Sequence, residues 1–130
     1  MPIMNKASPY NIAVKVETQY IEAESRPEDD FYVFAYHITI TNKGDISAQL
    51  LTRHWIITDS NGSKQEVKGD GVIGKQPLLK PNESFRYTSG TMMETPVGTM
   101  EGSYQMLADD GEHFDADIPV FLLALPNMLH

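Results

Sequence analysis

Hydrophobic and polar residues alternate along most of the chain, and this period of two predicts β-strands. Ile12, Val14 and Val16 share one side of residues 12–20, opposite charged and polar side chains, as in a half-buried strand. Residues 31–42 alternate in the same way and are rich in aromatic and β-branched side chains, which favours a central strand. Further strands are predicted over residues 49–58, 64–68, 83–90, 99–108 and 112–122.

Short polar and glycine-bearing segments separate these strands. Asn61-Gly62 and Asp110-Gly111 supply the positive φ that tight hairpins require. No segment combines helix caps with a 3.6-residue period. About seven strands with a turn every 8–12 residues predict an all-β fold, an immunoglobulin-like or fibronectin type III-like antiparallel β-sandwich. Longer loops are predicted over residues 22–30 and 90–98.

Length and composition fit one domain, predicted over residues 10–130 after a flexible N-terminus at residues 1–9. The net charge of −8 repels phosphate backbones, so no nucleic-acid partner is expected. Absence of cysteine, of a secretory signal and of an apolar run of about 18 residues favours a cytoplasmic protein without membrane insertion. The apolar residues 119–129 are either covered by the domain or form an association surface. A monomer or weak homodimer is expected.

Residues 69–74 read GxGxxG, the pattern of a dinucleotide-binding turn. Such a site needs a helix N-terminus to hold the pyrophosphate, whereas Pro77 and Pro81 prevent a helix from starting here. The glycines are therefore interpreted as a tight loop between strands, and backbone N–H groups of that loop could alternatively bind pyrophosphate or a dinucleoside polyphosphate. The residues predicted for a ligand or partner loop are Gly69, Asp70, Gly71, Gly74, Lys75 and Gln76, with Arg53 and His54.

Arg53, His54 and Trp55 are adjacent on one predicted strand. Strand alternation points His54 away from its two neighbours. If Trp55 belongs to the core, Arg53 lies on the same face, with its stem over apolar surface and its head in water. His54 would act as a general base only beside an orienting carboxylate or a proton donor. No GxSxG nucleophile elbow occurs, so no catalytic residues and no enzyme activity are predicted.

The acidic hairpin around Asp110 is the candidate metal site. His113, Asp115 and Asp117 alternate on one strand face, about 6.6–6.8 Å apart by strand rise. Carboxylates suit Mg²⁺ and an added imidazole suits softer ions such as Co²⁺. The same spacing is also typical of a solvated strand face, and no recognised ligand motif supports a cofactor. A cation-sensing site would use Asp110, His113 and Asp115.

Several segments in order resemble the ApaG family over roughly residues 10–130. Only the extreme N-terminus lies outside this resemblance. The matching segments are Val33-Phe34-Ala35-Tyr36, Arg53-His54-Trp55, Gly69-Asp70-Gly71-Val72-Ile73-Gly74-Lys75-Gln76-Pro77, Tyr87-Thr88-Ser89-Gly90, Thr95-Pro96-Val97-Gly98-Thr99-Met100-Glu101-Gly102-Ser103-Tyr104, Ile118-Pro119-Val120-Phe121 and Leu129-His130.

The resemblance implies a fibronectin type III-like sandwich in a stand-alone bacterial protein. It also implies an association with cobalt resistance and magnesium efflux, and a genetic neighbourhood of diadenosine tetraphosphate hydrolysis. Related eukaryotic domains, attached to F-box proteins and to a polymerase-delta-interacting protein, look like protein-interaction modules. The family offers no agreed catalytic residues. We therefore expect a non-catalytic binding module whose surface is formed by the loops at residues 69–77 and 90–98.

Overall fold

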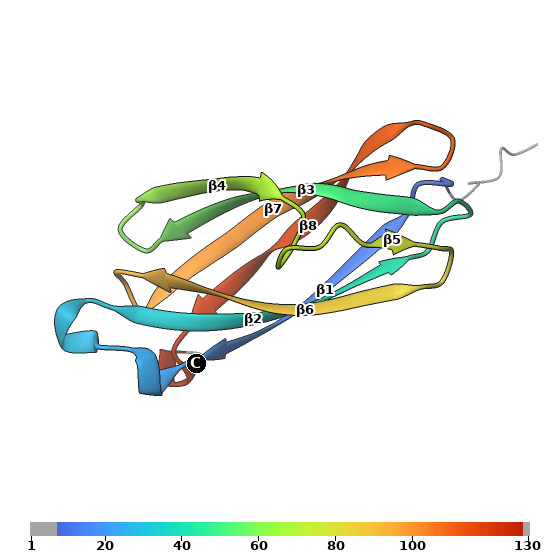
Figure 1. Ribbon diagram of the computed structural model, residues 1–130. Helices are drawn as coiled ribbons and strands as arrows, with labels where there is room; N and C mark the ends of the chain where they lie inside the picture. The colour runs from blue at the N-terminus through green and yellow to red at the C-terminus, as the bar shows by residue number, and fades with distance from the viewer. Residues whose placement is uncertain (1–7, 129–130) are drawn as a thin grey trace, which may run out of the picture.

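Two antiparallel sheets face each other and form a β-sandwich in the computed structural model, which describes residues 8–128 (Figure 1). One sheet has the strand order β1-β2-β6 and the other β4-β3-β7-β8, with the short β5 paired to β3. The predicted all-β sandwich is confirmed. The strands are β1 (Ile12–Tyr20), β2 (Tyr32–Asn42), β3 (Ala48–Asp59), β4 (Lys64–Asp70), β5 (Leu78–Leu79), β6 (Ser84–Met93), β7 (Val97–Ala108) and β8 (His113–Ala124).

The remaining regular structure consists of three short 3-10 turns, and the described residues contain no α-helix. The predicted loop at residues 22–30 contains two of them, η1 (Glu22–Glu24) and η2 (Pro27–Asp29), and η3 (Pro126–Met128) follows β8. Within residues 8–128, no helix has the length and apolar character needed to cross a bilayer.

The alternation of apolar residues along β2 places its side chains as predicted. Phe34, Tyr36, Ile38 and Ile40 are buried between the sheets, whereas the residues between them are only partly buried. β2 pairs with β1 on one side and with β6 on the other. It is therefore the central strand of its sheet, as its aromatic and β-branched composition indicates.

Aromatic rings from both sheets meet around Trp55. The Trp55 ring lies 5.4 Å from the ring of Tyr36 in the facing sheet and packs edge-on against Tyr104 and Phe121, at 6.4 and 5.9 Å between centroids. Edge-to-face geometry is favourable because the positive ring edge meets the negative ring face. This cluster fixes the distance between the sheets near their centre.

A buried hydroxyl pair also joins the two sheets. The Tyr87 and Tyr104 hydroxyl oxygens are 2.6 Å apart, linking β6 to β7. Burial raises the pKa of both phenols, because the phenolate would lose its hydration inside the core. Both phenols therefore stay neutral at physiological pH, and each hydroxyl satisfies the other.

Gly102 lets β7 pass close to β3. A Cβ at this position would lie 2.0 Å from the His54 carbonyl oxygen. The pairing of β7 with β8 is also irregular between Met100 and Gly102, which is typical of a β-bulge. The strand contact at this point therefore depends on the absence of a side chain.

One predicted loop differs from the structure, and the predicted N-terminal segment lies mostly outside the described residues. The loop predicted over residues 90–98 is wrong: β6 continues through Met93 because Gly90 and Met93 pair with Ala35 and Tyr32, and the turn contains only residues 94–96. Of the predicted flexible N-terminus, residues 1–7 lie outside the described part of the chain. Pro9, which is described, accepts a hydrogen bond from the Asp45 amide.

We predict that Gly102→Ala destabilises the fold by about 3 kcal/mol, because backbone must shift to accommodate the new methyl group. Urea denaturation of the purified variant measures this change. Glu101→Ala is the matched control, because Glu101 is its exposed neighbour on the same strand and should unfold within about 0.5 kcal/mol of the parent protein. Equal midpoints for Gly102→Ala and the parent would contradict the close approach.

We predict that Tyr104→Phe costs about 1–3 kcal/mol of unfolding free energy, because it leaves the buried Tyr87 hydroxyl without its partner. The double variant Tyr87→Phe/Tyr104→Phe removes both hydroxyls and should be more stable than the single variant. A double-mutant cycle by urea denaturation measures the coupling. Additive losses would show that the two hydroxyls act independently.

Candidate functional site

The GxGxxG segment begins in the last two residues of β4, Gly69 and Asp70, which pair with β3, and continues as a compact loop toward β5. Residues 69–77 are hereafter called the glycine loop. In Figure 1 the chain after β4 crosses the side of the sandwich where β4 and β6, the terminal strands of the two sheets, lie. The Val72 amide donates to the Lys75 carbonyl and the Lys75 amide donates back to Val72, at 2.8 and 2.9 Å. The prediction of a tight loop between strands, without a helix behind it, is confirmed.

Each glycine of the motif has a structural reason. A Cβ at Gly69 would lie 2.8 Å from the Arg53 guanidinium carbon, and one at Gly71 would lie 2.3 Å from the Lys75 carbonyl oxygen. Gly71 and Gly74 also have positive φ values of 62° and 77°, a backbone region that glycine enters without steric cost. The motif is therefore accounted for by local packing and turn geometry.

Arg53 holds the glycine loop against the sandwich. Its Nη1 donates to the carbonyl oxygens of Asp70 and Gly71, each at 2.9 Å. Arg53 shares the inner face of β3 with the buried Trp55, as predicted. Its guanidinium, expected to point into water, instead donates to the loop carbonyls. Sequence spacing could not reveal this contact, because it joins residues 17 and 18 positions apart.

Glutamine side chains and Val72 complete the attachment of the loop. Gln76 Nε2 donates to the Leu51 carbonyl, and Gln49 Nε2 donates to the Gln76 carbonyl. The Gly71 amide donates to Leu51 at 2.8 Å, and the Val72 side chain is buried in the core. The loop is thus preorganised by contacts to β3.

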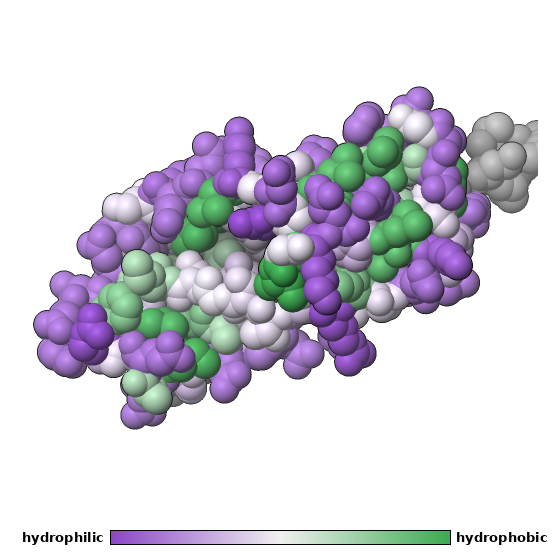
Figure 2. Space-filling model, viewed as in Figure 1, coloured by the Kyte–Doolittle hydropathy of each residue, from purple (hydrophilic) through white to green (hydrophobic). Residues whose placement is uncertain are grey.

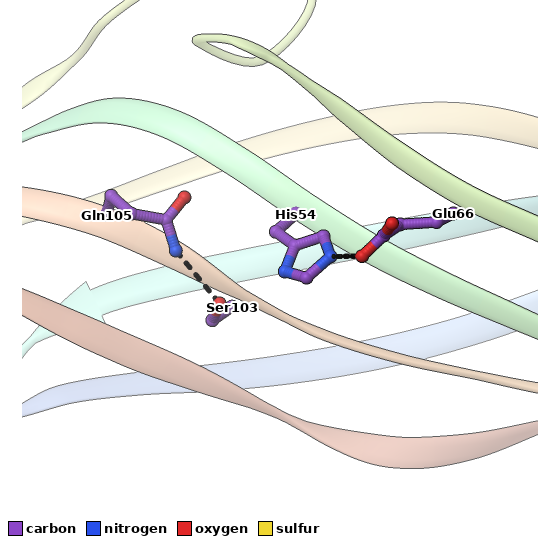
Figure 3. A network of polar contacts seen from close by, with 4 residues as sticks. All are labelled: His54, Glu66, Ser103 and Gln105. Atoms are coloured by element: carbon purple, nitrogen blue, oxygen red, sulfur yellow. Dashed lines mark hydrogen bonds and ion pairs between the residues drawn. The ribbon is translucent and has the colours of Figure 1, made fainter.

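His54 points to the opposite face of the sheet, as strand alternation predicts. Its Nε2 lies 2.6 Å from Glu66 Oε2 (Figure 3). This hydrogen bond lowers the pKa of the Glu66 carboxyl. Sequence reasoning missed Glu66, which reaches His54 only through the pairing of β3 with β4. His54 was predicted to share one ligand or partner site with Arg53 and the glycine loop. Its side chain instead lies on the opposite face of β3 from Arg53.

The polar contacts around His54 do not assemble a nucleophile. Ser103 lies opposite His54 in the β3–β7 ladder, but Ser103 Oγ accepts a hydrogen bond from Gln105 Nε2 at 2.9 Å (Figure 3). The His54 imidazole instead forms its hydrogen bond with Glu66. A general base needs its nucleophile within hydrogen-bond reach, and this face of the sheet provides no such pair for His54 among the described residues.

The residues of the candidate metal site are dispersed. Asp110 accepts a 2.5 Å hydrogen bond from the Tyr10 hydroxyl, which raises the pKa of Tyr10 to about 12 and lowers that of Asp110. His113 and Asp115 are exposed on β8, alternating with half-buried Phe114. Within residues 8–128, no three His, Asp or Glu side chains are grouped to hold a metal ion. The structure therefore gives the proposed cation site no support.

A groove with both polar and apolar lining residues lies between β4 and β6, hereafter the β4–β6 groove. Figure 2 shows it as a hollow of white and green surface between purple, hydrophilic residues. Two adjoining cavities of about 310 and 320 Å³ form it, and they share Ile57, Gln65 and Met92. Arg53 lines one end of the groove and holds the glycine loop there. The apolar lining includes Tyr36, Trp55, Ile57, Val67, Met92 and Met93.

We predict that Arg53→Lys speeds amide hydrogen exchange at Gly71 about tenfold, because an ammonium cannot reproduce the two guanidinium contacts. Exchange followed by NMR at neutral pH measures the change. His54→Asn, on the adjacent residue but the opposite face, is the control and should leave Gly71 exchange unchanged. Equal rates in Arg53→Lys and the parent would show that the loop is held by its other contacts.

Comparisons with known proteins agree with this architecture. A family model described as the ApaG domain matches residues 22–108. The chain is 61% identical to Protein ApaG of Azoarcus sp. (strain BH72) and 57% identical to Protein ApaG of Dechloromonas aromatica (strain RCB), in both cases over 98% of this chain and 100% of the relative.

A solved structure has the same fold. The crystal structure described as the putative ApaA protein from Bordetella pertussis superimposes with a TM-score of 0.90 at 48% identity, covering 93% of this chain and 98% of that one. Of the segments that carried the sequence resemblance, Leu129-His130 lies outside the described residues, and the others, among them Arg53 and the glycine loop, lie within the sandwich. The chain therefore belongs to the ApaG family.

Proposed function

We propose that this domain is a non-catalytic binding module that presents the glycine loop, with Ile73 at its tip, to a partner. The observation that carries the proposal is the conformation of Ile73. This residue has a φ of 43° and its side chain is 53% exposed. A β-branched residue in the left-handed region is an outlier that costs about 1–2 kcal/mol.

The folded chain gains little from keeping isoleucine at this position. Ile73 and Gly74 are the two central residues of a tight turn in which both have positive φ. Asparagine followed by glycine suits such a turn best, and the exposed Ile73 side chain adds little to the core. Unfavourable backbone conformations that persist in this way are characteristic of ligand-contacting sites, so we assign the apolar side chain to an intermolecular contact.

The rigidity of the glycine loop supports the same function. Arg53, Gln76 and Val72 fix the loop before any partner arrives. A preorganised surface loses less conformational entropy on binding, which leaves more of the contact energy for affinity. The family's association with cobalt resistance and magnesium efflux would then operate through a cytoplasmic partner rather than through an ion held by this domain.

Anion binding by the glycine loop is the alternative proposal. The positive φ values of Gly71, Ile73 and Gly74 resemble a backbone nest, and Lys75 adds a positive charge beside it. However, the amides of Gly71, Val72 and Lys75 already donate to carbonyl groups of the protein. Amide shift mapping with diadenosine tetraphosphate tests this alternative, and unshifted resonances from Gly69 to Lys75 would reject it.

We predict that Ile73→Asn stabilises the fold by about 1 kcal/mol, because asparagine tolerates the left-handed conformation, and abolishes partner binding. Urea denaturation measures the first effect. Affinity purification from native extract with quantitative mass spectrometry measures the second, with an expected loss of partners of at least about tenfold.

Val120→Asn provides the matched control. Val120 is 59% exposed on β8, at the other edge of its sheet from β4, so its replacement should retain the same partners as the parent. If Ile73→Asn and Val120→Asn recover identical partner sets, Ile73 does not contact a partner and the proposed function is wrong.

A further inference from the structure

We infer that the β4–β6 groove binds an extended peptide with apolar side chains at alternate positions and a Lys or Arg at one end. This inference goes beyond the proposed function, because it assigns a second binding surface on the same domain. The groove is separate from Ile73, which does not line it, so the two surfaces can be tested independently.

The shape of the groove suits an extended chain. It follows β6 from Ser89 to Glu94, a length of roughly 17 Å at the rise of a β-strand. β6 and β4 are the terminal strands of their sheets, so each has an edge whose backbone groups lack a strand partner. A peptide added beside β6 would hydrogen-bond to this edge, and its alternate side chains would enter the space between the sheets.

Met92 gives the groove an exposed apolar contact. Trp55, Tyr36 and Met93 also line the groove but are almost completely buried in the core. Methionine side chains are flexible and polarisable, and they adapt to differently shaped apolar groups. Met92 is 59% exposed, which leaves an apolar contact surface available along the groove.

The two ends of the groove differ in charge. Asp30, Asp59 and Glu94 line its far end, where Lys64 is the accompanying cation. The ion pairs of the described residues are Arg26–Asp29 and His54–Glu66, so none of these three carboxylates is neutralised by one. The opposite end carries Arg53. A cationic residue of the peptide is therefore attracted to the end at Glu94, where complementary charge favours one orientation over the reverse.

Three probe peptides with blocked termini test the inference. KKVTFTV has the proposed pattern, EEVTFTV reverses its charge, and KKSTSTS replaces its apolar side chains. Titration of the ¹⁵N-labelled protein should shift the amides of Gln65, Met92 and Glu94 with KKVTFTV. Binding of EEVTFTV should be at least about fivefold weaker, and KKSTSTS should produce no shifts because the apolar contacts are lost.

Two charge variants make the test decisive. Glu94→Lys should invert the preference between KKVTFTV and EEVTFTV, whereas Glu101→Lys, the same change on the exposed outer face of β7, should preserve it. Equal binding of all three probes, shifts outside the groove, or no shifts at millimolar peptide would overturn the inference. Ile73→Asn should bind KKVTFTV with the affinity of the parent protein. Failure of the peptide to bind the groove would therefore not bear on the Ile73 contact, which the affinity purification tests separately.

Discussion

The contact between the Arg53 guanidinium and the glycine loop is the interaction on which the position of the loop depends. Arg53 donates to two successive loop carbonyls from the inner face of β3. Gly69 leaves room for the guanidinium, and Gly71 leaves room for the Lys75 carbonyl. The loop is therefore held beside Arg53, which lines one end of the β4–β6 groove, while Ile73 remains exposed. A side chain at either glycine would displace the loop from this position.

The sandwich itself supplies the rigid support for this surface. The Trp55 cluster and the Tyr87–Tyr104 hydroxyl pair hold the sheets at a fixed separation, because close-packed interiors resist deformation. The space between the terminal strands is then a permanent groove with defined walls. On the proposed binding function, side chains placed on a rigid scaffold in this way would need little reorganisation when a partner arrives.

Sequence and structure disagree where pairing partners decide the conformation. The glycine and proline content of residues 90–98 is typical of a loop, yet residues 90–93 are part of β6 because β2 offers them a complete ladder. This extension makes β6 one wall of the groove. Glu66 likewise reaches His54 only across the β3–β4 ladder. Such contacts depend on register, which local composition does not encode.

The alternation of apolar residues determined the sandwich, its central strand and the side of β3 on which Trp55 lies, because each strand must bury one face. Pro77 and Pro81, which follow the GxGxxG motif, excluded a nucleotide-binding helix. Only the tertiary structure decided the rest: which carbonyls Arg53 reaches, why Ile73 keeps a left-handed backbone in a tight turn, and which strands border the groove. The Arg53 contacts and the groove join residues far apart in the chain, so they exist only after the sheets have paired and packed. The Ile73 turn is local, but the loop that contains it is held by contacts to β3.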